Sequence, residues 1–269
     1  MKETMEYTGE RMVPEKAEAY TFWEHIYRYR FAAQFVAGKR VLDIACGEGY
    51  GSAALRQSGA AGVIGVDVSA EACEHAARRY GIDARLGDAQ NIPLTNGSVD
   101  LVVSFETIEH VSDPEKFLDE CVRVLAPGGR LIISTPNRKA YLKDAPKNPF
   151  HLKELTEEEF SGLLAARFRE VQIYTQRPAA AGWWSSRLLA SESALWGVRG
   201  FRRLRWLLQR NFCLETVDAS ALERARANPI QAILTRQEGR AHLANPFAIR
   251  PKSDFSGEIP TYFLAVASL

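Results

Sequence analysis

The sequence lacks a long apolar segment, because no run reaches the roughly 18 consecutive apolar residues that a membrane-spanning helix needs. The N-terminus is polar and charged, so we expect no secretory leader. Net charge is also nearly absent, at +1 over 269 residues, which gives no global argument for a polyanionic partner. We therefore expect a cytoplasmic protein, with nucleic acid disfavoured as a partner.

Cysteine is scarce. The four cysteines, Cys46, Cys73, Cys121 and Cys213, follow neither a disulfide framework nor the spacing of metal ligands. We expect reduced, mostly buried thiols. The chain has no internal repeat, and its length and 46% hydrophobic content suffice for the core of one elaborated domain.

A glycine-rich stretch organises the first half of the chain. The apolar run Arg40 to Cys46 predicts a buried parallel strand, and a helix is expected from about Tyr50 to Gln57. Between them, glycines at 47, 49 and 51 allow a tight turn and the close approach of a ligand to the backbone. This pattern is typical of a nucleotide-binding turn.

Further strands and helices alternate along the chain, as in a doubly wound α/β sheet. Ser69 is the expected N-cap of one helix, and Thr156 with Glu159 forms the expected capping box of another. Ligands in such sheets bind at the carboxyl ends of the strands. The expected strands are 62–68, 84–86, 99–105, 130–135, 169–176 and 262–267.

The glycine-rich stretch, with Asp43 four residues before Gly47, reads D-x-x-x-G-x-G-x-G and resembles the first motif of class I S-adenosylmethionine-dependent methyltransferases. The resemblance implies a Rossmann-like sheet of seven strands and S-adenosylmethionine as cofactor. It implies that Asp67 binds the ribose diol and that Asp88 bonds the adenine amino group. Further cofactor contacts are expected at Ala45, Gly47, Gly49, Tyr50, Val68, Ala89 and Phe105.

The segment before the first strand is similar to that of methyltransferases that modify sugars and cell-surface glycans. It carries G-E-R-x-V-P-E, followed by an aromatic and basic helix expected over Tyr20 to Val36. By this resemblance, Arg11 or Tyr29 reaches the carboxylate of the cofactor. Packing or solvent exposure is the alternative role for both side chains.

The stretch Glu106-x-x-Glu109-His110 follows the fourth expected strand, and His151 lies in a later loop that returns over the same edge of the sheet. This arrangement resembles the metal site of small-RNA 2′-O-methyltransferases, and its first part is similar to ubiquinone-pathway O-methyltransferases. The resemblance implies Mg²⁺ or another divalent metal held by Glu106, Glu109, His110 and His151.

Two alternatives to the metal site stay open. His110 or His151 can act as a catalytic general base, because an imidazole pKa of about 6.5 suits proton removal near neutral pH. In the other alternative, Glu109 and His110 only make local hydrogen bonds that start a helix or loop.

Residues 178–260 separate the last two strands and far exceed an ordinary loop. We predict an N-terminal cap region at 1–38, an S-adenosylmethionine-binding core at 39–177, a helical acceptor-binding insertion at 178–260 and the last core strand at 261–269. Peripheral membrane contact is possible through this insertion, which has a basic amphipathic face over residues 201–212 and tryptophans at 183, 184, 196 and 206. The alternative is a helix that packs on its own core and leaves its basic face in solvent.

These features predict an enzyme that methylates a hydroxyl of a sugar, a glycan or a sugar-bearing metabolite, with metal assistance. One alternative acceptor is a quinone or another aromatic small molecule, and RNA ranks behind both. A hypothesis of another class is a catalytically silent scaffold that binds S-adenosylmethionine. The sequence does not determine the oligomeric state.

Overall fold

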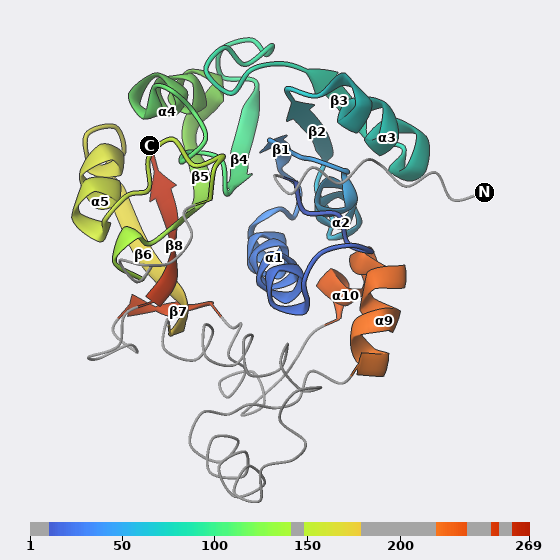
Figure 1. The fold of residues 1–269 in the computed structure, drawn as a ribbon. Helices are drawn as coiled ribbons and strands as arrows, with labels where there is room; N and C mark the ends of the chain where they lie inside the picture. The colour runs from blue at the N-terminus through green and yellow to red at the C-terminus, as the bar shows by residue number, and fades with distance from the viewer. Residues whose placement is uncertain (1–10, 141–147, 179–218, 236–248, 253–259) are drawn as a thin grey trace, which may run out of the picture.

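The structure, a computed structural model, describes residues 11–140, 148–178, 219–235, 249–252 and 260–269. Within them, one mixed sheet of eight strands lies between two layers of helices (Figure 1). The strand order is β3-β2-β1-β4-β5-β8-β6-β7, and β8 runs antiparallel to both of its neighbours. The strands are β1 Arg40–Ile44, β2 Gly62–Asp67, β3 Asp83–Leu86, β4 Val99–Phe105, β5 Leu125–Pro136, β6 Glu170–Pro178, β7 Ile249–Pro251 and β8 Pro260–Ser268.

Helices cover both faces of the sheet because alternate residues of each buried strand point to opposite sides. Leu42 and Val102 pack in a core with α4 and α5, whereas Val41 and Val103 pack in a core with α1 and α2. The helices are α1 Ala19–Ala32, α2 Tyr50–Gln57, α3 Ala70–Tyr80, α4 Pro114–Val124, α5 Glu157–Ala165, α9 Ala219–Ala227 and α10 Pro229–Leu234, with short 3-10 helices at Ala33–Phe35 and Arg138–Ala140.

The expected helix starts are confirmed. The Ser69 hydroxyl accepts a hydrogen bond from the Ala72 amide at the start of α3. At the start of α5, the Thr156 hydroxyl accepts from the Glu159 amide, and the Glu159 carboxylate accepts from the Thr156 amide. This reciprocal capping box fixes the point where the chain leaves the loop that carries His151.

The predicted count of seven strands is wrong, because β7 pairs antiparallel with β6 and adds an eighth strand. β7 comes from the insertion and has only three residues, too few to show an alternating pattern. The described part of the insertion also supplies α9 and α10, and α10 packs against α1 and α2. This part of residues 178–260 thus packs on neighbouring helices of the fold, and the acceptor-binding cap stays a prediction.

Several predictions lie outside the described residues, namely the basic face over 201–212, the four tryptophans of the insertion and Cys213. The other three cysteines are free, buried thiols, as expected. Among the described residues, no helix has the length and apolar character needed to cross a bilayer. The proposed division of the chain into domains stays a prediction.

Candidate functional site

The candidate site lies where the strand order reverses, between β1 and β4. These two strands are neighbours, and their connections run to opposite sides of the sheet. The described residues contain two non-glycine positions with positive φ, and one follows each of these strands: Ala45, with φ 58°, and Glu106, with φ 53°. Strained backbone concentrates at functional sites, and ligands of doubly wound sheets bind at this crevice.

The glycine-rich turn is shaped by close packing. Gly47 and Gly49 have φ of 55° and 85°, which side chains rarely adopt. A Cβ on Gly49 would also lie 2.5 Å from the Cβ of Ala76 on α3. The turn therefore brings the start of α2 into close contact with α3.

Asp67 ends β2 with its carboxylate held in place by the backbone. The amides of Gly47 and Ser69 donate to it at 2.8 and 2.9 Å. Arg11 also reaches it, with Nη2 at 3.5 Å, while the aliphatic part of the Arg11 side chain lies over Gly47. The structure thus places Arg11 at the predicted cofactor site, beside the carboxylate expected to bind ribose.

Asp43 is buried and takes hydrogen bonds from the Ser52 hydroxyl at 2.6 Å and the Tyr29 hydroxyl at 3.2 Å. Burial raises the pKa of Asp43 to about 7, although these two hydrogen bonds oppose the shift. The Asp43 side chain thus fixes the start of α2, and the Tyr29 hydroxyl, predicted to reach the cofactor, is bonded to Asp43.

The Tyr29 ring lies between α1 and the glycine-rich turn. It makes edge contacts with Tyr50 and Phe105, with ring centroids 5.6 and 5.1 Å apart. A Cβ on Gly51 would come within 2.1 Å of the ring, so only glycine leaves room for it. Tyr50 and Phe105, both predicted cofactor contacts, are therefore brought together by a side chain of α1.

The ends of β2 and β3 expose two apolar side chains, with 77% of Val68 and 60% of Leu86 accessible. Asp88 follows them, and its exposed carboxylate accepts from the Gln90 amide at 2.8 Å. Ala89 packs partly buried at the rim of the core. Exposed apolar side chains beside a carboxylate suit an adenine ring and its amino group. Leu86 was not predicted, since its exposure depends on where β3 ends.

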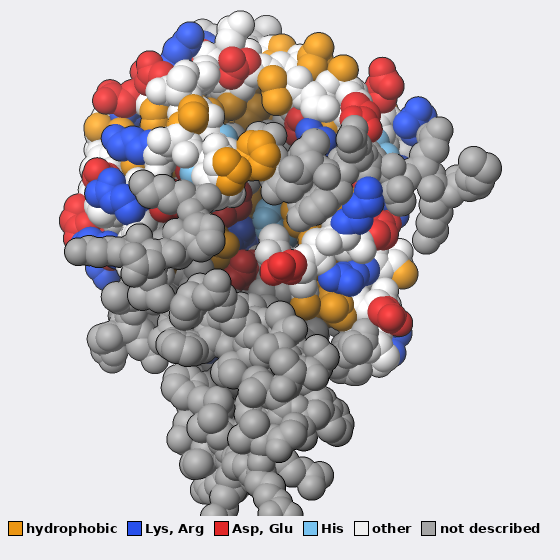
Figure 2. Space-filling model, viewed as in Figure 1, with side chains coloured by type: hydrophobic (Ala, Val, Ile, Leu, Met, Phe, Trp, Pro, Cys, Tyr) orange, Lys and Arg blue, Asp and Glu red, His pale blue; other side chains and the backbone are white. Residues whose placement is uncertain are grey.

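Three of the four predicted metal ligands lie together, namely Glu109, His110 and His151. One ligand atom from each lies within 4.8 Å of the others. The imidazole rings meet edge to face, with centroids 4.9 Å apart. The loop that carries His151 is bonded to the segment after β4, since the amides of Leu152 and Lys153 donate to the Glu109 carbonyl at 2.8 and 3.2 Å. Figure 2 shows histidine, acidic and basic side chains together near the centre of this face.

Both histidines use Nδ1 for a partner other than the cluster. His110 Nδ1 lies 2.9 Å from the Phe150 carbonyl, and His151 Nδ1 lies 2.9 Å from the Glu154 carboxylate. As hydrogen-bond donors at Nδ1, both rings carry the lone pair on Nε2. Metal-binding histidines are oriented in this way. His151 Nε2 lies 3.0 Å from the Asn148 amide nitrogen, and this contact would have to yield to a metal.

Glu109 is fully buried, and its Oε1 makes no hydrogen bond to a described residue. Oε2 accepts from the Thr135 hydroxyl at 3.3 Å. Burial, aided by the charge of Glu106, raises the pKa of Glu109 well above its ordinary value. A carboxylate so placed requires a proton or a cation as partner, so the donor set of two imidazoles and one carboxylate fits a divalent metal.

Glu106, the fourth predicted ligand, lies outside this cluster. The Ser134 hydroxyl donates to its Oε1 at 2.8 Å, and Arg28 Nη1 lies 3.5 Å from the same oxygen. Arg28 is buried on α1; burial opposes its charge, but attraction by Glu106 and Tyr262 raises its pKa. Sequence reasoning missed Arg28, Ser134 and Glu154. For Glu154 the three-residue spacing from His151 was a usable signal, whereas the other two join the site only through the tertiary fold.

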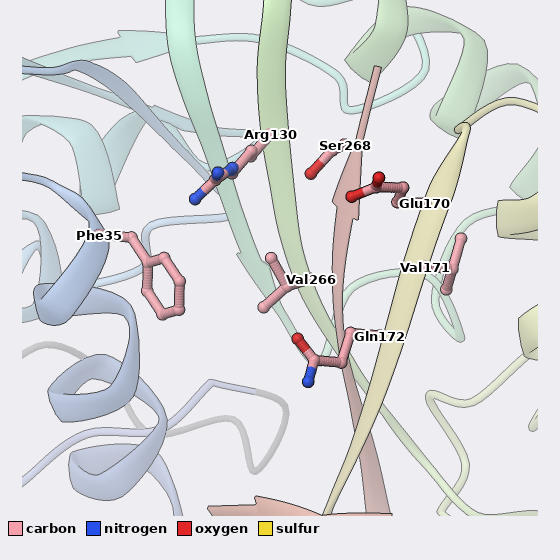
Figure 3. A pocket seen from close by; sticks show the side chains of 7 residues that line it. All are labelled: Phe35, Arg130, Glu170, Val171, Gln172, Val266 and Ser268. Atoms are coloured by element: carbon pink, nitrogen blue, oxygen red, sulfur yellow. The ribbon is translucent and has the colours of Figure 1, made fainter.

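A recess on the sheet lies away from this cluster (Figure 3). Glu170 lies at the start of β6 and Ser268 at the end of the antiparallel strand β8. The recess therefore lies at the edge of the sheet opposite to the carboxyl ends of β5 and β6. It contains none of the predicted site residues. Its lining residues are Phe35, Arg130, Glu170, Val171, Gln172, Val266 and Ser268.

Comparison with known proteins finds similarity to methyltransferases. Residues 42–133 match a family described as methyltransferase domain. A protein of Mycolicibacterium smegmatis named as a probable S-adenosylmethionine-dependent methyltransferase is 44% identical over 169 residues, which cover 61% of this chain and 65% of that protein. Residues 42–133 are therefore similar to a methyltransferase domain, and the mycobacterial relative is named as S-adenosylmethionine-dependent.

Two further comparisons concern a curated relative and a solved structure. A ubiquinone biosynthesis O-methyltransferase of Psychrobacter arcticus is 40% identical over 118 residues, covering 40% of this chain and 45% of that protein. The chain spans less than two thirds of both relatives. A crystal structure of an S-adenosylmethionine-dependent methyltransferase from Thermotoga maritima superposes with a TM-score of 0.57 over 98% of this chain and 99% of that one, at 19% identity. This last likeness supports the fold alone.

Proposed function

We propose that the protein transfers the methyl group of S-adenosylmethionine to a hydroxyl of a sugar, a glycan or a sugar-bearing metabolite, assisted by a divalent metal. The clustering of Glu109, His110 and His151 at the carboxyl end of β4 is the observation that supports this most. The buried Glu109 carboxylate has one oxygen without a hydrogen bond to a described residue, and it lies beside two imidazoles oriented through Nδ1. A bound divalent cation would lower the pKa of a coordinated hydroxyl and orient a vicinal diol.

Different residues would bind different parts of the cofactor. The glycine turn and Asp67 would hold the ribose end of the cofactor, and Val68, Leu86 and Asp88 would hold the adenine. The methyl group would then face the end of β4, next to His110. In-line attack needs the acceptor oxygen held there and its proton removed, which are the two tasks that the histidine cluster suits.

A second acceptor class is favoured by one specific feature. Phe150 and Leu152 flank His151 with 36% and 64% of their side chains exposed, although both are large and apolar. Such a border would bind the ring of a quinone or another aromatic hydroxyl compound. One relative carries the name ubiquinone biosynthesis O-methyltransferase. In this case a histidine would act as the base.

The test is methyl transfer from labelled S-adenosylmethionine to nucleotide sugars, glycosides, catechols and RNA termini, with Mg²⁺ or Mn²⁺ and with chelator. We expect labelling of a sugar diol that chelator abolishes. Labelling of catechols alone, insensitive to chelator, would support the second acceptor class. Binding of S-adenosylhomocysteine without labelling of any acceptor would instead indicate the silent scaffold.

Alanine variants at the two histidines test the metal site directly. We expect His110→Ala and His151→Ala each to weaken Mn²⁺ binding about tenfold or more, measured from the free Mn²⁺ signal in electron paramagnetic resonance. His75→Gln is the matched control, since His75 is a buried histidine on α3, remote from the cluster. Equal Mn²⁺ affinity in all three variants would refute a metal site at these histidines.

A further inference from the structure

Arg28 joins three strands at one edge of the sheet, where β4 and β6 end and the antiparallel strand β8 begins. It is 1% exposed, its Nε donates to Gln176 Oε1 at 3.0 Å, and its guanidinium lies 4.1 Å above the Tyr262 ring. Its Nη1 lies 3.5 Å from Glu106 Oε1. The remaining nitrogen, Nη2, is buried and makes no hydrogen bond to any residue that the structure describes. A planar guanidinium fixed on two other sides is a rigid partner for a carboxylate.

Glu106 is the less buried member of this pair. Its side chain is 17% exposed, and its carboxylate is held by Arg28 and by the Ser134 hydroxyl. Its φ of 53° places the side chain at a strained turn, three residues before Glu109. A change of side-chain rotamer alone can move this carboxylate, because the residue is not enclosed by the core.

The histidine cluster is short of oxygen ligands. Glu109, His110 and His151 supply one carboxylate and two nitrogens. Hard divalent cations such as Mg²⁺ prefer six ligands and mostly oxygen. The charge of Glu106 acts on Glu109, and Glu106 lies three residues before it in the chain, so Glu106 is the candidate for a further oxygen ligand.

We propose that Arg28 is a positioning residue that competes with a divalent cation for the carboxylate of Glu106. A cation bound by Glu109, His110 and His151 draws Glu106 from Arg28 and Ser134 into its ligand set. This inference rests on the metal site of the proposed function. It predicts that a residue of the N-terminal helix, which pairs with Glu106 and whose charge also acts on Glu109, sets the metal affinity.

The test measures Mn²⁺ affinity by electron paramagnetic resonance, without cofactor or acceptor. We expect Arg28→Met to tighten Mn²⁺ binding about fivefold, the factor that corresponds to an ion pair of about 1 kcal/mol. Glu106→Gln should weaken binding, and adding Arg28→Met to it should change nothing further. Arg30→Met is the matched control, because Arg30 lies on the same helix and bonds the carbonyls of α10.

Ser134→Ala guards against a folding defect of the Arg28 variant. It removes the other contact of the Glu106 carboxylate without changing any charge, so it should tighten Mn²⁺ binding as well. If Arg28→Met tightens binding by the same factor with and without Glu106→Gln, the effect is simple charge repulsion and the inference fails. Unchanged affinity in Arg28→Met and Ser134→Ala also overturns it. If the unaltered protein binds no Mn²⁺, the metal site of the proposed function fails as well.

Discussion

Replacing Gly51 by alanine tests the contact between the Tyr29 ring of α1 and the start of α2. The added Cβ would lie 2.1 Å from the Tyr29 ring, far inside van der Waals contact. The ring must then move, and its hydroxyl leaves Asp43, a buried carboxyl group that it bonds at 3.2 Å. Because Gly51 lies in α2 with ordinary helical φ, alanine itself meets no backbone strain.

The magnitude follows from three contributions. Overpacking costs about 1–3 kcal/mol, and the loss of a buried hydrogen bond costs about 1–3 kcal/mol. Alanine recovers about 1 kcal/mol of helix propensity over glycine. We expect Gly51→Ala to lower the free energy of unfolding by roughly 1–5 kcal/mol, measured by urea denaturation.

Two further variants make this prediction refutable. Gly62→Ala is the control, because a Cβ on Gly62 meets nothing within 4 Å, and its effect should stay within about 0.5 kcal/mol. In the background of Tyr29→Ala the ring is gone, so Gly51→Ala should be neutral or slightly stabilising there. If Gly51→Ala costs as much with Tyr29→Ala as without it, the clash is not its cause.

Two other perturbations follow from the same contacts. Burial raises the pKa of Asp43 from 3.8 to about 7, so folding favours its protonated form; the stability it contributes is present below pH 4 and is lost as pH rises to about 7. Asp43→Asn should therefore remove up to about 4 kcal/mol of the fall in unfolding free energy between pH 4 and 7, and an unchanged pH dependence in urea denaturation would contradict this. Thr156→Ala breaks the capping box of α5 and should cost about 1 kcal/mol in thermal or urea unfolding, whereas Thr235→Ala, at an exposed helix end, should cost less than half of that.

The sequence by itself determined the layout of the doubly wound α/β core. Hydrophobic runs and glycine spacing placed β1, α2 and β4 correctly. A buried parallel strand and a glycine-rich turn are both recognisable from a few consecutive residues. The helix caps at Ser69 and Thr156 were predictable for the same reason, since each involves residues three apart. The resemblance of E-x-x-E-H and His151 to a known metal site also predicted that Glu109, His110 and His151 lie together.

The tertiary structure alone decided which side chains meet. The eighth strand, β7, has three residues and exists through pairing with β6. Arg28 joins the site only because α1 packs across the sheet edge where β4 and β6 end and β8 begins, and no spacing in the sequence reports that contact. Likewise, Glu106 belongs to the metal motif by sequence, yet Arg28 and Ser134 hold its carboxylate outside the cluster, because charge and hydrogen bonding act between elements far apart in the chain.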